Sequence, residues 1–434
     1  MASALQRFAN VRRDEIPAVL ASVAYFLFVL AALQVIRPAR EALGMRSGLD
    51  AVRWLFVGTA VVTLAVNPLF GALVSKFRRF SFIAATYGFF AVSLLLFWAL
   101  LTFAPQRAGE VSGRVFYVWF SVFNLFVTMV FWALMVDRFS LEQSKRLFGL
   151  IAVGGTLGAM LGPWLAWRYA EVWGAQNLLL VAVGFLGLAT LAARVVVGLR
   201  PESQGDRTSA PPALEKDAII GGSAWDGLRD VFRSPYLVGI CAFVLVMTVM
   251  ATFIYFTRLA MVAAMTEAVD ERTGLFAQID FWTQFTTFLL QLLVTGHVMK
   301  RLGVGVALAL LPVVVSLGFI GLAVSGSFAA LVILEATYRA TQRGLTRPAR
   351  ETLFTVVRRE DKYKAKSVID TFVYRTGDVV GAWTEGLLGA LGYGVTALAA
   401  VVVPTSAAWA ALGLWLARQQ TKAAAARGVD GATP

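Results

Sequence analysis

The chain has 434 residues, of which 58% are hydrophobic and only 15% are charged. Soluble domains carry about 25% charged residues, so this composition predicts an integral membrane protein embedded in a lipid bilayer and excludes an ordinary soluble enzyme. The formal net charge of +13 would suggest a nucleic-acid partner only if the basic residues lay on a soluble domain. Most of them lie in short connections between apolar runs, so we expect no nucleic-acid binding.

Twelve apolar runs are long enough to cross a bilayer, which takes roughly 20 residues. The predicted spans are residues 16–36, 52–74, 81–103, 115–136, 147–168, 176–198, 236–258, 275–298, 303–324, 328–349, 367–390 and 394–417. The longest polar interruption, 199–234, divides them into six and six. We therefore predict an all-α membrane protein with two six-helix bundles, at 1–198 and 235–420, joined by a cytoplasmic linker at 199–234 and followed by a disordered tail at 421–434.

The connections on the side of the N-terminus carry far more Lys and Arg than those on the opposite side. This asymmetry places both termini in the cytoplasm, and we expect a bacterial inner (plasma) membrane. The polar N-terminus predicts no cleaved signal peptide. Two six-span halves are typical of secondary transporters, whose substrate site lies near the midplane between the halves. In agreement, the stretch Gly71–Arg79 resembles the glycine-and-basic loop of the major facilitator superfamily, and a monomer is the expectation for that architecture.

Ionised side chains inside a span are candidate site residues, because each costs about 2.5–3.5 kcal/mol at the centre of the membrane. In the span 328–349 and just after it, one helix face is predicted to carry a charged stripe, made of Glu335, Arg339, Arg343, Arg347 and Arg350. A stripe that faces a wet cavity would attract an anion, and we expect Arg339 and Arg343 to bind it. Arg347 and Arg350 lie close to the cytoplasmic end, where snorkelling or a structural gate pair is an equally good explanation.

The next span carries a second predicted stripe, made of Lys366, Asp370, Tyr374 and Asp378, with Arg375 beside it. Asp280 lies in the span 275–298, and Arg258 ends the span 236–258. Internal salt bridges could pair three acids with three bases, namely Asp280, Glu335 and Asp378 with Arg339, Arg343 and Arg375. Adding Arg37, Arg40 and Arg258 leaves a positive excess, so we predict a cationic cavity that suits an organic anion or phosphate.

The sequence has no cluster of His, Cys and carboxylates at metal-ligand spacing and no nucleophile with a base, so we expect no metal, no cofactor and no enzymatic activity. Glycines recur at four-residue spacing at Gly154, Gly158 and Gly162, and again at Gly377 and Gly381. Small residues at this spacing let two helix backbones approach closely, which predicts a packing role.

Three phrases resemble the ATP/ADP translocase family, the nucleotide carriers of plastids and intracellular bacteria. The phrase at 36–43, IRPAREAL, is similar to the end of the family's helix 1, and RPARE at 347–351 is similar to the end of its helix 10. The third, KAKSVID at 364–370 followed by RTGD at 375–378, is similar to the family's helix 11. The resemblance implies a major-facilitator fold, exchange of ATP for ADP, and a basic substrate site that includes Arg40.

Four positions depart from the family pattern. Arg40 stands where the family has Lys, Asp378 stands where it has Lys, and Ser121 and Tyr255 fall near two family glutamates. The substrate is therefore either a nucleotide, moved by counter-exchange, or another anionic solute, moved by proton symport or export. A non-transporting membrane sensor or assembly partner is the alternative from a different class.

The two RPARE phrases close predicted spans on opposite sides of the membrane, and we expect them to act as two alternating gates. In this hypothesis the anion is bound by Arg40, Arg339, Arg343 and Arg375, with Arg37 and Arg258 at the outer mouth. Coupling or gating falls to Asp280, Glu335, Asp378, Glu41, Arg350, Glu351, Lys366 and Asp370. Pro38 and Pro348 lack an amide donor and can permit a bend in each helix.

Overall fold

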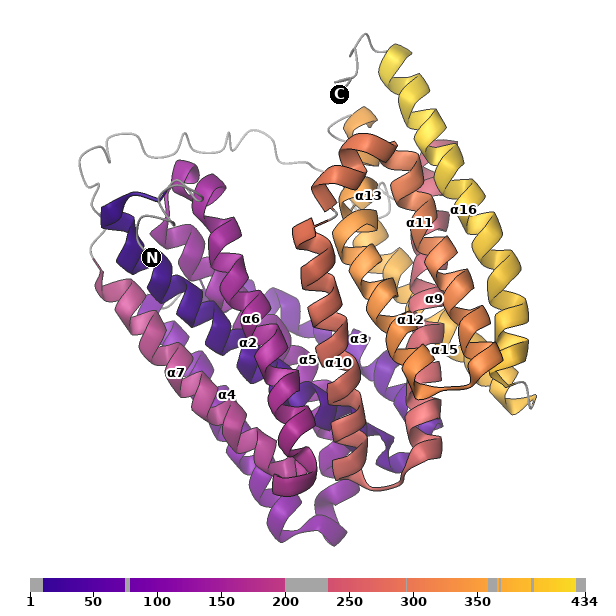
Figure 1. Cartoon of the computed structure of the whole chain (residues 1–434). Helices are drawn as coiled ribbons and strands as arrows, with labels where there is room; N and C mark the ends of the chain where they lie inside the picture. Colours follow the sequence, from indigo (N-terminus) through magenta and orange to yellow (C-terminus); the bar gives the residue numbers. More distant parts are fainter. Residues whose placement is uncertain are drawn as a thin grey trace. The chain divides into compact units, whose positions relative to one another are not determined.

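The computed structural model describes residues 11–74, 79–199, 233–293, 295–357, 365–366, 368–391 and 394–426. All regular secondary structure in these residues is helical, and each predicted span has a helical counterpart. Eight of the described helices are long and apolar enough to cross a membrane by length and composition. The chain is an all-α, multi-pass membrane protein, and it divides into two compact units (Figure 1).

The first unit comprises Met1–Ala210 together with Val262–Phe281. Its long helices are α2 (Ile16–Gly44), α3 (Leu49–Val74), α4 (Arg79–Phe103), α5 (Pro105–Arg138), α6 (Leu141–Trp173) and α7 (Leu178–Gly198). Short 3-10 helices connect them at η1 (Arg13–Glu15), η2 (Met45–Ser47) and η3 (Ala175–Asn177). The same unit contains the end of α9 (Pro235–Met265) and the first half of α10 (Val269–Leu293), so α10 belongs to both units.

Helices α2 and α6 pack backbone against backbone (Figure 1). A Cβ atom added at Gly154 would lie 2.2 Å from the carbonyl oxygen of Val23, and one at Gly158 would lie 2.1 Å from that of Leu27. Real Cβ atoms do not approach a backbone that closely, so only glycine permits this contact. The packing role predicted for the glycine stripe is confirmed here.

The second unit comprises Pro211–Met261 and Trp282–Pro434. Besides most of α9 and the second half of α10, it contains α11 (Thr295–Ser325), α12 (Phe328–Thr341), α13 (Arg347–Leu353), α15 (Tyr374–Ala390) and α16 (Val395–Ala426), with the 3-10 helix η5 (Phe354–Val356). Helices α11 and α16 run side by side (Figure 1). Gly377 and Gly381 of α15 pack against Thr248 and Thr252 of α9.

Two π-helical segments interrupt the second unit's helices, at η4 (Gln342–Thr346) between α12 and α13 and at η6 (Ile369–Val373) before α15. The prediction of two uninterrupted α-helical stripes is wrong in this respect, because a π turn shifts the residues that follow it out of the α-helical register. Pro348 supplies a physical reason for η4. It has no N–H to donate to the carbonyl of Gly344, four residues earlier, which lies inside the π segment.

Most of the predicted linker, 199–234, lies outside the described residues, which resume at 233. Helix α16 continues to Ala426, beyond the predicted start of the tail at 421, and the residues after it lie outside the described part.

Candidate substrate site

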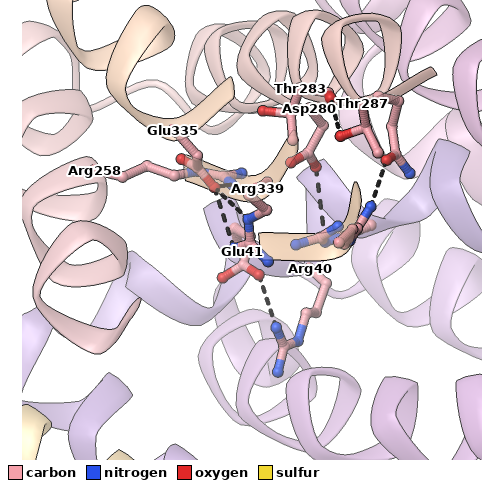
Figure 2. Close-up of polar contacts among 11 residues, drawn as sticks. Arg40, Glu41, Arg258, Asp280, Thr283, Thr287, Glu335 and Arg339 are labelled. Atoms are coloured by element: carbon pink, nitrogen blue, oxygen red, sulfur yellow. Dashed lines mark hydrogen bonds and ion pairs between the residues drawn. The ribbon is translucent and has the colours of Figure 1, made fainter. Parts of the chain in front are cut away.

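In the first unit, Arg40 near the end of α2 is enclosed by three contacts. Its Nη1 lies 2.7 Å from Oε1 of Glu41, and its guanidinium carbon lies 3.4 Å from the centre of the Tyr117 ring. Its Nε also donates to the carbonyl oxygen of Tyr117, at 3.3 Å. The Glu41 side chain is only 1% exposed, so its contact with Arg40 is a buried ion pair (Figure 2). The guanidinium also stacks on the Tyr117 ring.

Arg37 is one helical turn earlier on α2, and its Nε lies 3.8 Å from Oδ2 of Asp280 on α10. Asp280 is 3% exposed and Arg37 is 21% exposed. A second contact holds the start of α10 in the same unit, because Asp270 Oδ1 accepts a hydrogen bond of 2.7 Å from the backbone N–H of Ala175. Arg37 and Asp280, predicted as a binding and a coupling residue, are therefore partners in this structure.

In the second unit, Glu335 of α12 lies between two arginines (Figure 2). Its Oε1 is 3.0 Å from Nη1 of Arg258 and 3.2 Å from Nη2 of Arg339. Arg258 and Glu335 are both fully buried, whereas Arg339 is 23% exposed. Arg258 was expected at an outer mouth, but here it is inside the unit, where losing one member of a buried ion pair would be strongly destabilising.

A cavity of about 730 Å³ opens within the second unit. Its lining includes five basic side chains, Arg343, Arg347, Arg350, Lys366 and Arg375. Among the residues that the structure describes, Glu351 is the one carboxylate in that lining, which also contains Met247, Gln342, Thr346 and Tyr374. Both π-helical segments border the cavity, since η4 supplies part of its wall and η6 immediately precedes Tyr374.

The cationic side chains of the cavity differ in how far they are compensated. Arg343 Nη1 donates 2.7 Å to the neutral amide oxygen of Gln284 on α10, and Arg375 lies 3.3 Å from Asp378 on its own helix. Arg347 is exposed and makes no ion pair with any residue that the structure describes. The described residues of the lining therefore carry a positive excess that an anion can neutralise.

Arg350 and Lys366 share the remaining carboxylate, Glu351. Arg350 also donates a hydrogen bond to the hydroxyl of Tyr374. Partial burial raises the pKa of Glu351, but the hydrogen bonds and charges of Lys366 and Arg350 outweigh burial, and its pKa lies below the ordinary value. Glu351 is therefore ionised at neutral pH.

Several predicted site residues are brought together by this cavity, namely Arg343, Arg350, Glu351, Lys366 and Arg375. Arg339 is held by Glu335 and is not in the lining. Asp370 lies in η6, and its side chain lies outside the described part of the structure.

Sequence reasoning missed Gln284 and gave no role to Tyr117. A polar amide four residues after Asp280, on the same face of a membrane helix, was the available signal for Gln284. Arg347, for which snorkelling was an open explanation, lines the cavity. In the described residues, no group of three or more His, Cys, Asp or Glu side chains is placed to hold a metal ion.

The chain is similar to ADP,ATP carrier protein 1 of Chlamydia muridarum, with 22% identity over 297 residues that cover 61% of this chain and 56% of the relative. It is also 22% identical over 325 residues to ADP,ATP carrier protein 1 of Chlamydia pneumoniae, which cover 66% of this chain and 63% of that relative. The chain thus spans between 56% and 63% of the length of these curated relatives. The resemblance that the sequence phrases predicted is confirmed as a distant similarity.

Two solved structures show the same fold. One is a bacterial homologue of the human lysosomal transporter Spinster, with TM-score 0.51, 16% identity and coverage of 94% of each chain. The other is the nucleoside transporter NupG, with TM-score 0.58, 12% identity and coverage of 94% of this chain and 99% of that chain. The sequence profile of the Major Facilitator Superfamily matches residues 18–338, which is most of the sequence. The protein therefore belongs to the Major Facilitator Superfamily, a family of membrane transporters and not of enzymes.

Proposed function

We propose that this protein is a secondary transporter that moves an anionic organic solute by alternating access. One observation carries the proposal. The second unit holds a cavity of about 730 Å³, and the described residues of its lining include five basic side chains and one carboxylate. Ionised residues in membrane helices are costly and gather where they serve a substrate or ion pathway. An excess of cations around one cavity is the arrangement that attracts an anion.

The chemistry of the lining favours phosphate or carboxylate groups. Arginine presents a planar fork of donors that matches both groups, and four of the five basic side chains are arginines. The similarity to proteins named ADP,ATP carriers supports a nucleotide or another phosphorylated compound, moved by counter-exchange. Asp378, Ser121 and Tyr255 depart from the family pattern and leave a retargeted anion as the alternative.

We assign substrate contact first to the cavity residues Arg343 and Arg375, with Arg350 and Lys366 at its rim. Arg339 is a further candidate for substrate contact in the second unit, because its side chain is partly exposed. If Arg339 moves toward the substrate, Glu335 keeps its ion pair with Arg258. We also propose that three further arginines change ion-pair partners during the transport cycle, namely Arg37, Arg40 and Arg258. The ion pairs that they make in this structure belong to one conformation of that cycle.

Proton coupling is a second candidate mechanism, favoured by the Arg375–Asp378 pair. Asp378 is 24% exposed and lies 3.3 Å from a cavity arginine on the same helix. A proton on this carboxylate would release Arg375 to bind the solute, which links proton and anion binding. Uptake driven by a pH gradient without internal solute would support this mechanism over exchange.

We further propose that residues 1–198 and 235–420 act as the two bundles of a monomeric carrier in a bacterial inner membrane, with both termini in the cytoplasm. The excess of Lys and Arg in the connections on that side supports the orientation. Protease digestion of a C-terminal tag in inside-out and right-side-out vesicles tests it. A tag that is cut only in right-side-out vesicles would reverse the assignment.

Uptake of labelled ATP into proteoliposomes, either loaded with ADP or left empty, tests the function. Wild type is compared with Arg343→Ala, Arg375→Ala and Arg40→Ala. Arg114→Ala is the matched control, because Arg114 is a surface arginine of the first unit that pairs with the exposed Glu110. Nucleotide exchange predicts uptake that requires internal ADP, is lost in the three variants and survives in the control.

Absence of ATP uptake by folded protein would exclude the nucleotide substrate and leave other phosphorylated and carboxylated solutes to be screened. If no anion is bound or moved by folded protein, the proposed transport of anions is wrong. In that case a membrane sensor or assembly partner becomes the better explanation of the same fold.

A further inference from the structure

Among the described residues, the lining of the cavity contains five basic side chains and a single carboxylate, Glu351. We infer that Glu351 is a resident counter-ion, which occupies Arg350 and Lys366 while the cavity is empty and is displaced by the incoming anion. The inference rests on the proposed function, because it requires that the cavity binds an anion. In this role Glu351 sets the affinity of the cavity for anions and its preference among anions of different charge.

The geometry divides one negative charge between two cations. Glu351 Oε1 lies 3.2 Å from Nη2 of Arg350, and Oε2 lies 2.5 Å from Nζ of Lys366. Each carboxylate oxygen therefore fills the position that an oxygen of a bound phosphate, sulfate or carboxylate would take. A solute that uses both cations has to replace both contacts.

Exposure indicates which of the three side chains is free to leave. Arg350 is 7% exposed and is fixed in addition by its hydrogen bond to Tyr374. Glu351 is 41% exposed and Lys366 is 31% exposed. The carboxylate can turn into water and be solvated there, whereas the arginine stays in the wall. Displacement of Glu351 thus leaves a formed site behind.

Glu351 also controls the potential in the rest of the cavity. Arg343 donates to the neutral amide oxygen of Gln284, and Arg347 makes no ion pair with a residue that the structure describes. Among the described lining residues, Glu351 is therefore the carboxylate that repels an entering anion. Removal of the Glu351 charge should strengthen the binding of an anion in proportion to the charge of that anion, because Coulomb energy scales with the product of the two charges.

Titration of sodium sulfate and of sodium pyrophosphate into the purified full-length protein in nanodiscs, followed by calorimetry, tests the inference. Glu351→Gln keeps the shape of the side chain and removes its charge. We expect sulfate affinity to rise about tenfold, because the repulsion between the Glu351 carboxylate and the anion is removed. The affinity for pyrophosphate should rise more, because pyrophosphate carries more negative charge. Glu110→Gln, an exposed carboxylate in the first unit, is the control and should change neither affinity.

Equal or weaker binding by folded Glu351→Gln, with wild type binding normally, would overturn the inference and leave the proposed function intact. If neither protein binds sulfate or pyrophosphate, both fail together. Should the Gln variant not fold, Glu351→Asp replaces it. The shorter carboxylate cannot reach both cations, so its affinity should exceed that of wild type, and unchanged affinity would contradict the inference.

Discussion

The phrase Arg-Pro-Ala-Arg-Glu occurs once in each unit, and the same local arrangement forms twice. In both copies the second arginine pairs with the glutamate that follows it and contacts a tyrosine: Arg40 with Glu41 and Tyr117, and Arg350 with Glu351 and Tyr374. The surroundings differ. Glu41 is 1% exposed, whereas Glu351 is 41% exposed and is shared with Lys366. One copy is buried and the other opens to a cavity.

The first arginine of each phrase shows the same contrast. Arg37 is paired with the buried Asp280, while Arg347 is exposed and lines the cavity. A short sequence therefore sets the pairing of neighbouring side chains, and the packing around it decides whether the pair fixes the structure or meets a ligand. The first copy has the features of a structural lock, and the second has those of a binding site.

The largest expected difference between the copies is in stability. Glu41→Ala leaves the enclosed Arg40 without its adjacent carboxylate, and we expect a loss of about 3–5 kcal/mol in the free energy of unfolding. Glu351→Ala removes a partly exposed partner and should cost no more than about 1 kcal/mol. Thermal unfolding of both variants in detergent, followed by tryptophan fluorescence, measures the contrast. Equal losses would remove the distinction between a buried and an open copy.

The next effect concerns anion affinity. Arg347→Ala removes a cavity cation whose charge no described carboxylate neutralises, and we expect sulfate affinity to fall at least about tenfold, the size of one charged hydrogen bond. Arg37→Ala should leave affinity within about twofold and lower the melting temperature, because it removes an ion-pair partner of the buried Asp280. Calorimetric titration gives the affinities. A larger effect of Arg37→Ala on binding would transfer the ligand-facing role to the first copy.

The tyrosines should differ more modestly. Tyr374→Phe removes the hydroxyl that accepts from Arg350, and we expect a loss of about 1 kcal/mol in stability. Tyr117→Phe keeps both the ring under Arg40 and the backbone carbonyl that accepts from it, so the contacts of Arg40 should persist and the loss of stability should be smaller. Chemical or thermal unfolding of the two variants side by side tests this. A cost for Tyr117→Phe as large as that for Tyr374→Phe would contradict the assignment.

The smallest expected effect is in the pH dependence of stability. The pKa of Glu351 is lowered in the folded protein, so its stabilising contribution is present above the unfolded value of about 4.3 and is lost as pH falls through the folded value. The difference in melting temperature between wild type and Glu351→Gln should be constant near neutral pH and shrink in acid. A difference that grows as pH falls would have the wrong sign for this carboxylate.

The sequence was sufficient for the features that depend on composition and local spacing. Apolar length located the spans. Four-residue spacing marked Gly154 and Gly158 as a close-packing face and placed Glu335 and Arg339 on one helix face, and the structure shows contacts at both. The charged stripes beyond Arg339 could not be placed, because a π segment leaves no periodic trace in a sequence, although Pro348 hinted at a break. Contacts between distant helices, such as Arg343 with Gln284, depend on tertiary packing that spacing alone does not contain.

The glycine contact between α2 and α6 has a consequence for how motion can be observed. Because the two backbones touch at Gly154 and Gly158, neither helix can slide or tilt on its own without a collision. Arg40 and Glu41 therefore travel with α6 whenever α2 moves. A spectroscopic label placed on the exposed surface of α6 would report displacement of the first RPARE phrase, at 37–41. The labelled position is distant from that phrase in the sequence, so the label leaves the buried ion pair intact.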